Sequence, residues 1–460
     1  MSFNPEKQYR CTIIRGKAKN LMDDLLPAYA HILERICPCS GNSFTQLFNA
    51  ELLAILPSVT VKTLNNHRTE IAGKLFGMYY KSPEDVINIS ERTEKLLEDF
   101  DQPAFFKDIC YKFQFPNGMD KIGKTKQDIR KGINIRQCSY VLEVLKEADN
   151  NKVLLTVHEV GYYVLNALEV LQGKTTPKEV VAMIIDRRKK KVNKRVPSGS
   201  HGTQHIRETF NYLELSNLIR IIEGSLILNK EEKKAINFIS KAWDRDLDFD
   251  LKYYNLNTLK GRKQMYFKWQ EYYSKVSTRS SDVFFTSVKS ISKDIDQMKK
   301  EGYDVVDGID TTAIGDEGEL YVYAREKKRV QSYNKRLANR VLWLGKTKGL
   351  GFDIQSIRAD NSNKDDYAIY IEVKSTKRVT PPKDDGSSWN DVVSLTRNEW
   401  VAAEQKGEDF YIFRVYLTPD KIAIFSISNP FKEDQKGLIK VVPEKYRVDF
   451  SEKSGGFISE

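Results

Sequence analysis

The chain has 460 residues, of which 40% are hydrophobic and 30% charged, so it is long enough for about three domains with buried cores. No apolar run reaches the ~18 residues that a membrane-spanning helix needs, and the N-terminal residues lack an apolar signal-peptide segment. The five cysteines are odd in number, and only Cys37 and Cys39 are close together. This composition argues against a membrane protein and against a disulfide-stapled secreted domain, and predicts reduced thiols in a cytoplasmic protein.

Charge is unevenly distributed along the chain. Residues 301–460 contain 25 Lys and Arg against 27 Asp and Glu, so of the totals of 74 and 63, residues 1–300 carry 49 and 36, a net charge of +13. A concentrated positive field attracts polyanions. The sequence therefore predicts an N-terminal part that binds nucleic acid, joined to a nearly neutral C-terminal part. The alternative is a generally basic protein of a lysine-rich proteome.

Residues 43–80 have the pattern of two helices separated by a short turn. One helix is expected over residues 44–56, Pro57-Ser58 interrupts it, and a polar helix begins at Thr60. This arrangement is typical of a helix-turn-helix, whose second helix presents polar side chains to phosphates or base edges. The candidates for DNA contact are Lys62, Asn65, Asn66 and Arg68. The alternative is an ordinary helical hairpin.

Residues 118–125, GMDKIGKT, match the P-loop pattern. A P-loop follows a buried strand and opens a helix that packs on a sheet, but only the short run 113–115 precedes the match. The residues that follow, 126–132, are charged and few. We therefore expect a basic surface loop and no requirement for ATP.

Residues 137–230 are typical of a winged helix-turn-helix. Helices are expected over residues 138–148, 156–171 and 176–191, a further helix begins at Gln204, and residues 218–228 read as a hairpin that forms the wing. Basic residues on a mobile loop neutralise phosphates, while a positioned helix reads bases. The candidates are Arg187, Arg188, Lys189, Lys190, Lys191, Lys194 and Arg195, followed by Gln204 and Arg207. The alternative for the basic run is a solvated helix end.

The C-terminal part contains two strand-like runs, residues 352–357 and 367–374, separated by a polar turn. Apolar and polar residues alternate in the second run, so Glu372 and Lys374 share one face. If the runs pair as a hairpin, Asp353 lies next to Glu372. Adjacent carboxylates with hard oxygen ligands favour Mg²⁺, and a neighbouring lysine can stabilise charge on a phosphate. This pattern predicts hydrolysis of a phosphodiester.

Asp353 with Glu372-Val373-Lys374 resembles the PD-(D/E)xK core of nucleases, although Phe352 stands where a proline usually precedes the aspartate. The predicted elements around this core come in a fixed order along the chain. A helix with Glu319 is followed by a strand, by the two strand-like runs, and by a helix that the capping box of Thr396 and Glu399 opens. Over roughly residues 310–417 this order resembles the NO VEIN C-terminal domain, which is similar to Mrr-type restriction nucleases.

The resemblance implies roles for individual residues. Asp353, Glu372 and the Val373 carbonyl would hold Mg²⁺, for which Mn²⁺ could substitute. Lys374 would assist the attacking water, and Glu319 would be an additional active-site acid. The catalytic set is therefore Asp353, Glu372, Lys374 and Glu319.

We therefore predict an α+β multidomain protein. Residues 1–135 would form a helical DNA-recognition domain with the helix-turn-helix, 136–232 a winged-helix-like domain, 233–300 a helical connector, and 301–460 an α/β restriction-endonuclease-like domain. The predicted function is Mg²⁺-dependent, sequence-specific hydrolysis of double-stranded DNA without ATP, as in a type II restriction enzyme. A cognate methyltransferase is the expected companion, and a homodimer is left open.

Three alternatives remain from the sequence. A modification-dependent or nicking endonuclease would share the catalytic residues and differ in substrate. A DNA-binding regulator with an inactive nuclease-like domain is disfavoured by the intact acid-acid-lysine set. A translocase driven by nucleotide hydrolysis has only the P-loop match in its support.

Overall fold

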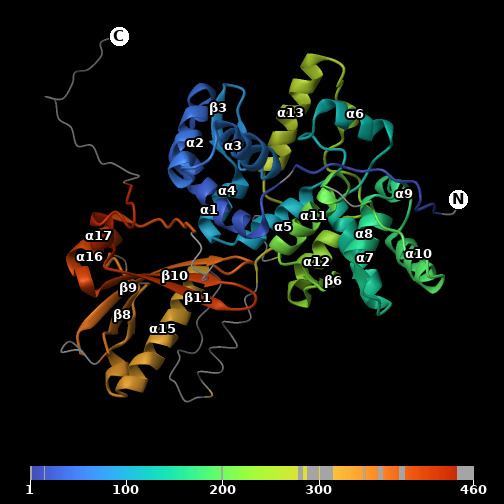
Figure 1. The fold of residues 1–460 in the computed structure, drawn as a ribbon. Helices are drawn as coiled ribbons and strands as arrows, with labels where there is room; N and C mark the ends of the chain where they lie inside the picture. Colours follow the sequence, from blue (N-terminus) through green and yellow to red (C-terminus); the bar gives the residue numbers. More distant parts are fainter. Residues whose placement is uncertain are drawn as a thin grey trace, which may run out of the picture.

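The computed structural model of the chain describes residues 3–14, 16–197, 200–277, 283–286, 300, 314–345, 347, 349–360, 366–382 and 389–442. These residues form a protein of mixed helix and sheet, as the sequence predicted. Residues 278–282 and 287–299 of the predicted connector lie outside the described residues, as do residues 361–365 of the predicted turn. A larger, mostly helical N-terminal unit lies beside a C-terminal unit built on one sheet (Figure 1).

The first part of the N-terminal unit places helices around a small antiparallel sheet of strand order β1-β3-β2. Its elements are α1 (Lys19–Ile36), β1 (Cys39–Ser40), α2 (Gly41–Ile55), α3 (Val61–Asn66), the π-helix η1 (His67–Leu75), β2 (Tyr79–Lys81), β3 (Val86–Ile89), α4 (Glu91–Asp99), α5 (Gln102–Lys112) and α6 (Ile122–Arg130). The predicted helix–turn–helix pattern at residues 44–68 is present, and the Thr60 side chain caps α3 by accepting from Thr63 N.

The second part of the N-terminal unit carries another small sheet, of order β4-β6-β5. Its elements are α7 (Gln137–Asn150), β4 (Leu155–Thr156), α8 (Val157–Val160), the π-helix η2 (Gly161–Leu165), α9 (Leu168–Leu171), α10 (Pro177–Lys189), α11 (Ser200–Leu215), β5 (Ile219–Ile222), β6 (Ser225–Leu228), η3 (Lys230–Glu232), α12 (Lys233–Ser240), η4 (Leu251–Tyr253) and α13 (Leu259–Ser274). One continuous hydrophobic core extends from Cys11 to Phe284. The segments predicted as separate N-terminal domains therefore pack together.

The local predictions for this part are largely confirmed. The hairpin of β5 and β6 turns at Glu223 and Gly224, which both have positive φ, as a two-residue turn requires. Capping boxes at Thr156 and Thr176 open α8 and α10. The single helix expected over residues 156–171 is wrong: it breaks at Asn166, whose side-chain amide donates to the carbonyl of Gly161.

The C-terminal unit is a five-stranded sheet of order β11-β10-β9-β8-β7 with helices on both faces. Its elements are α15 (Ile314–Tyr333), η5 (Leu337–Arg340), β7 (Leu342–Trp343), β8 (Ile354–Ile357), β9 (Ala368–Lys377), α16 (Arg397–Lys406), η6 (Gly407–Asp409), β10 (Phe410–Leu417), β11 (Ile422–Ser428) and α17 (Pro430–Gln435). Strands β9 and β10 are parallel, and the other neighbours are antiparallel.

The two faces of β9 have different coverings because side chains alternate along a strand. Ile369, Ile371 and Val373 share a core with apolar residues of α15. On the other face Tyr370 joins a cluster around Ala402 and Ala403 of α16. Glu372 and Lys374 lie on this second face, between the sheet and the beginning of α16.

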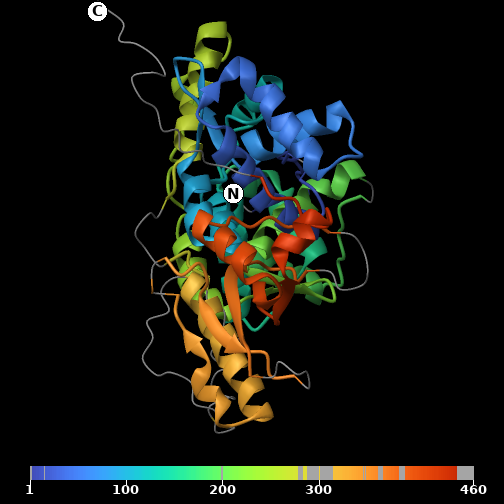
Figure 2. The same cartoon turned by 90° about the vertical axis from the view of Figure 1, so that its left-hand side faces the viewer.

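The strand with the Glu-x-Lys motif ends inside the junction between the two units. The side chain of Lys377 is fully buried, and its ammonium lies 2.8 Å from a carboxylate oxygen of Glu317 and 2.8 Å from the Thr286 carbonyl oxygen. The Thr286 hydroxyl also accepts from Lys107, which pairs with Glu232. From this junction α15, β8 and the first part of β9 extend away from the N-terminal unit (Figure 2). None of the helices in the described part of the chain combines the length and apolar character that a bilayer crossing requires.

Candidate active site and nucleic-acid interface

The hairpin predicted from the sequence forms, and it brings Asp353 and Glu372 together. Strand β8 pairs with β9 so that Ile354 faces Ile371, and Asp353 precedes β8 at this end of the sheet. The backbone N–H of Asp353 donates to the Ile371 carbonyl at 3.0 Å, and its carboxylate accepts from the Val373 N–H at 2.8 Å. Strand β9 therefore holds Asp353 through both its backbone N–H and its side-chain carboxylate.

Lys374 lies between two carboxylates. Its ammonium is 2.6 Å from Oε1 of Glu372 and 3.0 Å from Oε2 of Glu399, the third residue of α16. The sequence identified Glu399 only as part of a helix cap. That capping box is present, with Thr396 as the N-cap. The contact with Lys374 makes Glu399 a candidate functional residue that sequence reasoning missed, since only its capping spacing was visible.

The pKa values of Asp353, Glu372 and Lys374 are all raised, because the carboxylates are buried and outnumber the ammonium. Burial raises the pKa of Glu372 to about 9, with Asp353 and Glu399 adding to the rise and Lys374 opposing it. Burial also raises the pKa of Asp353, against the hydrogen bond from Val373 N. Burial would lower the pKa of Lys374, but Glu372 and Glu399 raise it above its ordinary value. Three ionised carboxylates around one ammonium leave a net charge of −2, which a divalent cation would balance.

The donor set fits magnesium better than a metal that is caged by protein ligands. Within the ranges that the structure describes, no three His, Cys, Asp or Glu side chains are arranged to hold a metal ion. Asp353 and Glu372 offer two carboxylates, and the Val373 carbonyl points to the same side of β9 as its N–H. Mg²⁺ is usually bound by one or two carboxylates and keeps several waters. These three residues could therefore hold it.

Glu319 lies on the other helix-covered face. It belongs to α15, and its Oε2 accepts from the indole N–H of Trp343 at 2.7 Å. A Cβ at Gly345 would come within 2.0 Å of the same oxygen, so the glycine makes room for the carboxylate. Glu319 therefore lies against Trp343 of β7 and against Gly345. Glu372 and Lys374 instead face α16. Its role as an additional acid stays a prediction.

The beginning of α16 is brought close to Asp353 by a glycine. Gly351 has a φ of +77°, and a Cβ there would lie 2.5 Å from the Asn398 carbonyl oxygen and 2.8 Å from the Ala402 side chain. The ring of the next residue, Phe352, packs against the ring of Tyr370, with 4.8 Å between the ring centroids. The close approach of helix and loop sets the position of Glu399.

Replacing Gly351 with alanine should destabilise the C-terminal unit by about 1–3 kcal/mol and slow any catalysis at this site, because strain at positive φ adds to a backbone clash. Gly349→Ala is the matched control: its φ is +91°, but no atom lies within 4 Å of the added Cβ. Thermal unfolding of the two variants separates these contributions. Equal losses of stability would show that the approach of α16 is not constrained by Gly351.

The candidates on α3 and η1 fall into two groups. Lys62 and Asn66 are exposed. Arg68 is buried, and its guanidinium donates to the side-chain oxygens of Asn49 at 2.6 Å and Asn65 at 2.8 Å. This network ties α2 to α3, which favours a supporting role for Asn65 and Arg68.

The basic run begins in the last turn of α10, is exposed except for the half-buried Arg187, and is partly neutralised. Arg188 forms a 2.6 Å ion pair with Glu159, Lys190 forms a 2.8 Å ion pair with Asp186, and Arg187 and Lys194 lie 3.7 and 3.8 Å from Glu6. The exposed members Lys189, Lys191 and Arg195 complete the run.

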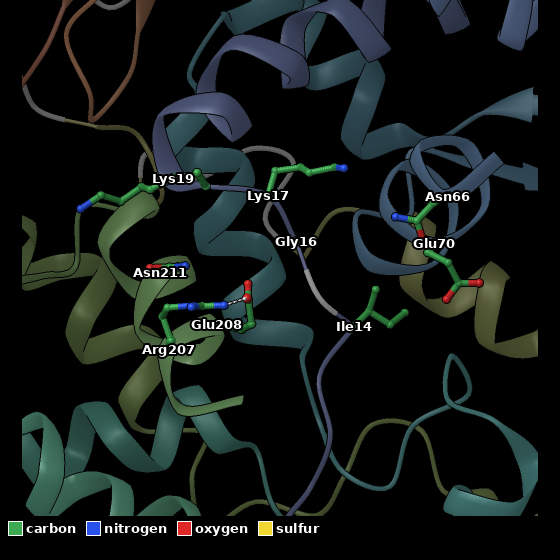
Figure 3. A pocket seen from close by; sticks show the side chains of 10 residues that line it. Ile14, Gly16, Lys17, Lys19, Asn66, Glu70, Arg207, Glu208 and Asn211 are labelled. Atoms are coloured by element: carbon green, nitrogen blue, oxygen red, sulfur yellow. Dashed lines mark hydrogen bonds and ion pairs between the residues drawn. The ribbon is translucent and has the colours of Figure 1, made fainter. Parts of the chain in front are cut away.

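Asn66 and Arg207, two of the residues predicted to contact DNA, face each other across one cavity. The cavity has a volume of about 760 Å³ and is lined from three directions (Figure 3). Asn66 and Glu70 come from α3 and η1, and Lys17 and Lys19 come from the segment before and at the start of α1. The residues contributed by α11 are Arg207, Glu208 and Asn211; Gln204 lies half-buried on the same helix. Lys17 and Lys19 were missed, although they stand in the basic stretch RGKAK.

The P-loop match has a different structure from a nucleotide site. Lys124 lies on α6, where its ammonium contacts Asp128 at 2.5 Å, the Tyr9 hydroxyl at 2.8 Å and the Arg10 carbonyl at 3.0 Å. The residues before the match form only an isolated bridge, between Phe115 and Ile135. A Cβ at Gly118 would lie 2.4 Å from the Trp269 ring. The Lys124 ammonium therefore binds groups of this chain, where a P-loop lysine would bind the phosphates of a nucleotide.

Fold and site together define a type II restriction-endonuclease-like protein. Residues 3–270 match the family described as restriction endonuclease BpuJI, N terminal, and the chain belongs to this family. Residues 318–427 match the family of protein NO VEIN, C-terminal, which confirms the resemblance identified from the sequence. The sequence reasoning did not identify the N-terminal family.

One solved structure adds to this. It is titled as pyrene- and phenanthrene-modified DNA in complex with the BpuJ1 endonuclease binding domain. The two chains are 52% identical with a TM-score of 0.58, and the similarity covers 60% of this chain and all of the other. No curated protein matches the chain.

Proposed function

We propose that this chain is a Mg²⁺-dependent, sequence-specific DNA endonuclease of the type II restriction class. The N-terminal unit would bind and read duplex DNA, and the C-terminal sheet would hydrolyse a phosphodiester bond. The observation that carries the proposal is the convergence of Asp353, Glu372 and Lys374 at one end of the sheet. It is supported by the 52% identity of the N-terminal unit to a domain whose structure is described as a DNA complex.

The proposed DNA-reading surface combines both halves of the N-terminal unit. The order α7, β4, α8, α11 and the β5–β6 hairpin, with β4 paired to β6, suits a winged helix in which α11 is the reading helix. Arg207 of α11 and Asn66 of α3 line the cavity and have donors that suit base edges. Lys17 and Lys19 in the same cavity would meet phosphates, which hold the register without reading the sequence.

The proposed chemistry uses a carboxylate pair and an ammonium. Asp353, Glu372 and the Val373 carbonyl would hold Mg²⁺, or Mn²⁺ in its place, and the ion would supply activation of a water and stabilisation of charge on the phosphate. Lys374 donates hydrogen bonds toward the attacking water or the phosphate oxygen, where negative charge grows. The sheet and α16 keep bulk water away from Glu372, which is only 2% exposed, while the Lys374 side chain is 23% exposed and so remains within reach of a substrate.

DNA binding should depend steeply on salt, since each neutralised phosphate contributes a log–log slope of about −0.9. In the Glu372→Ala chain, which leaves the N-terminal unit intact, the double change Lys17→Ala, Lys19→Ala should make that slope shallower by roughly 2. Lys252→Ala, an exposed lysine on η4, is the control and should leave it unchanged. Titrations of labelled duplex at several salt concentrations give the slopes. If the double variant keeps the slope of its Glu372→Ala parent, the cavity is not the DNA-binding surface.

A further inference from the structure

Glu399 makes two kinds of contact with one oxygen. Its Oε2 accepts from the backbone N–H of Thr396 at 2.9 Å, which is half of the capping box, and lies 3.0 Å from the ammonium of Lys374. The other half of the box is the bond from the Glu399 N–H to the Thr396 hydroxyl, at 3.3 Å. A capping box needs only an acceptor at this position, and glutamine serves as well as glutamate. The negative charge of Glu399 is therefore not required by the cap.

The carboxylate of Glu399 is held in place before any substrate arrives. Gly351 allows the backbone of Asn398 to lie against the loop that leads to Asp353, and Ala402 and Ala403 bury the next turn of α16. The side chain itself is only 15% exposed. Long surface carboxylates lose rotamer entropy when they pair with a lysine, but here packing and the cap have already restricted Glu399.

Lys374 would obstruct cation binding if Glu372 were its only partner. Its ammonium lies 2.6 Å from Oε1 of Glu372, which is one of the two carboxylates that could hold a divalent cation. The ammonium has three N–H donors and no acceptor. Glu399 offers it a carboxylate that belongs to α16 and not to the Asp353–Glu372 pair. An ammonium anchored there can leave Glu372 without losing its counter-charge.

We propose that Glu399 is a positioning residue of the nuclease site: its carboxylate is a second anchor for the Lys374 ammonium, so that the ammonium keeps a counter-charge and faces the scissile phosphate when a divalent cation takes Glu372. The proposal rests on the proposed nuclease function. It assigns Glu399 no contact with the phosphate or the cation, and it separates the charge of the residue from its capping role.

The test compares Glu399→Gln with Thr396→Ala in the full chain. The glutamine keeps an acceptor for the Thr396 N–H and loses the charge. Thr396→Ala keeps the charge and the Thr396 N–H, but removes the hydroxyl that caps α16. Single-turnover cleavage of duplex DNA in Mg²⁺, duplex binding in Ca²⁺ and thermal unfolding are measured for both variants, beside wild type and Lys374→Ala.

Glu399→Gln should reduce the cleavage rate at saturating enzyme by ~10–100-fold, as loss of a group that orients a ligand typically does, with DNA binding and the unfolding temperature unchanged. Thr396→Ala should lower the unfolding temperature and keep most of the cleavage rate. Wild-type cleavage by Glu399→Gln, unfolding of that variant, or an equal loss of rate in Thr396→Ala would overturn the inference. If wild type cuts no duplex at all, the proposed function fails instead, and the two failures are thereby distinguished.

Discussion

Replacement of Glu372 by alanine is expected to abolish DNA cleavage while folding and duplex binding persist. The variant removes one of the two carboxylates that could hold Mg²⁺ and a direct partner of Lys374. Loss of one preorganised electrostatic contact to a transition state typically costs ~10²–10³ in rate, so cleavage should fall at least that far. Asp353→Ala and Lys374→Ala should behave similarly, because each removes a different member of the same group.

The experiment measures cleavage of duplex DNA in Mg²⁺ and binding of the same DNA in Ca²⁺. Glu404→Ala is the control, since Glu404 is an exposed carboxylate on the same helix as Glu399. Glu372→Gln adds a check on folding: burial disfavours the ionised form of Glu372, so without divalent cations the neutral amide should not lower the unfolding temperature. Undiminished cleavage by Glu372→Ala would remove the active-site assignment.

Replacement of Lys377 by methionine should cost about 3–5 kcal/mol of stability, the usual cost of breaking a buried ion pair. Its ammonium is fully buried against Glu317, the Thr286 carbonyl and the Phe285 ring, at the junction of the two units. The variant leaves the Glu317 carboxyl largely buried without its cation. Thermal or urea unfolding measures the loss, with exposed Lys440→Met as the control.

The double variant Lys377→Met, Glu317→Gln should recover part of that loss, because a buried pair replaced as a whole is often tolerated. If the double variant is more stable than Lys377→Met, the loss of stability comes from the Glu317 carboxyl that the single variant leaves unpaired. A Lys377→Met chain as stable as wild type would mean that the ion pair does not hold the junction together.

Sequence reasoning reached the hairpin of the candidate site because its signal is local. The two-residue period of β9 put Glu372 and Lys374 on one face, and the polar turn paired that strand with the run after Asp353. The capping box at Thr396 and Glu399 was equally local. The contact between Glu399 and Lys374 was not, because it depends on how closely α16 approaches Gly351.

Tertiary contacts also account for the differences in the N-terminal unit. Arg68 looked like a DNA-facing cation, but its guanidinium turns back to Asn49 across the helix pair. The cavity that unites Asn66 with Arg207 is lined by segments more than a hundred residues apart, so no periodicity reveals it. The same holds for Lys377, whose buried partners come from both units.

Cleavage of plasmid DNA by the full wild-type chain in Mg²⁺ without ATP, followed by sequencing of the ends, tests whether this chain is a sequence-specific endonuclease. The expected result is discrete fragments whose ends all lie at a fixed position relative to one shared sequence. Absence of cleavage, ends scattered over unrelated sequences, or cleavage only when ATP is added would contradict it.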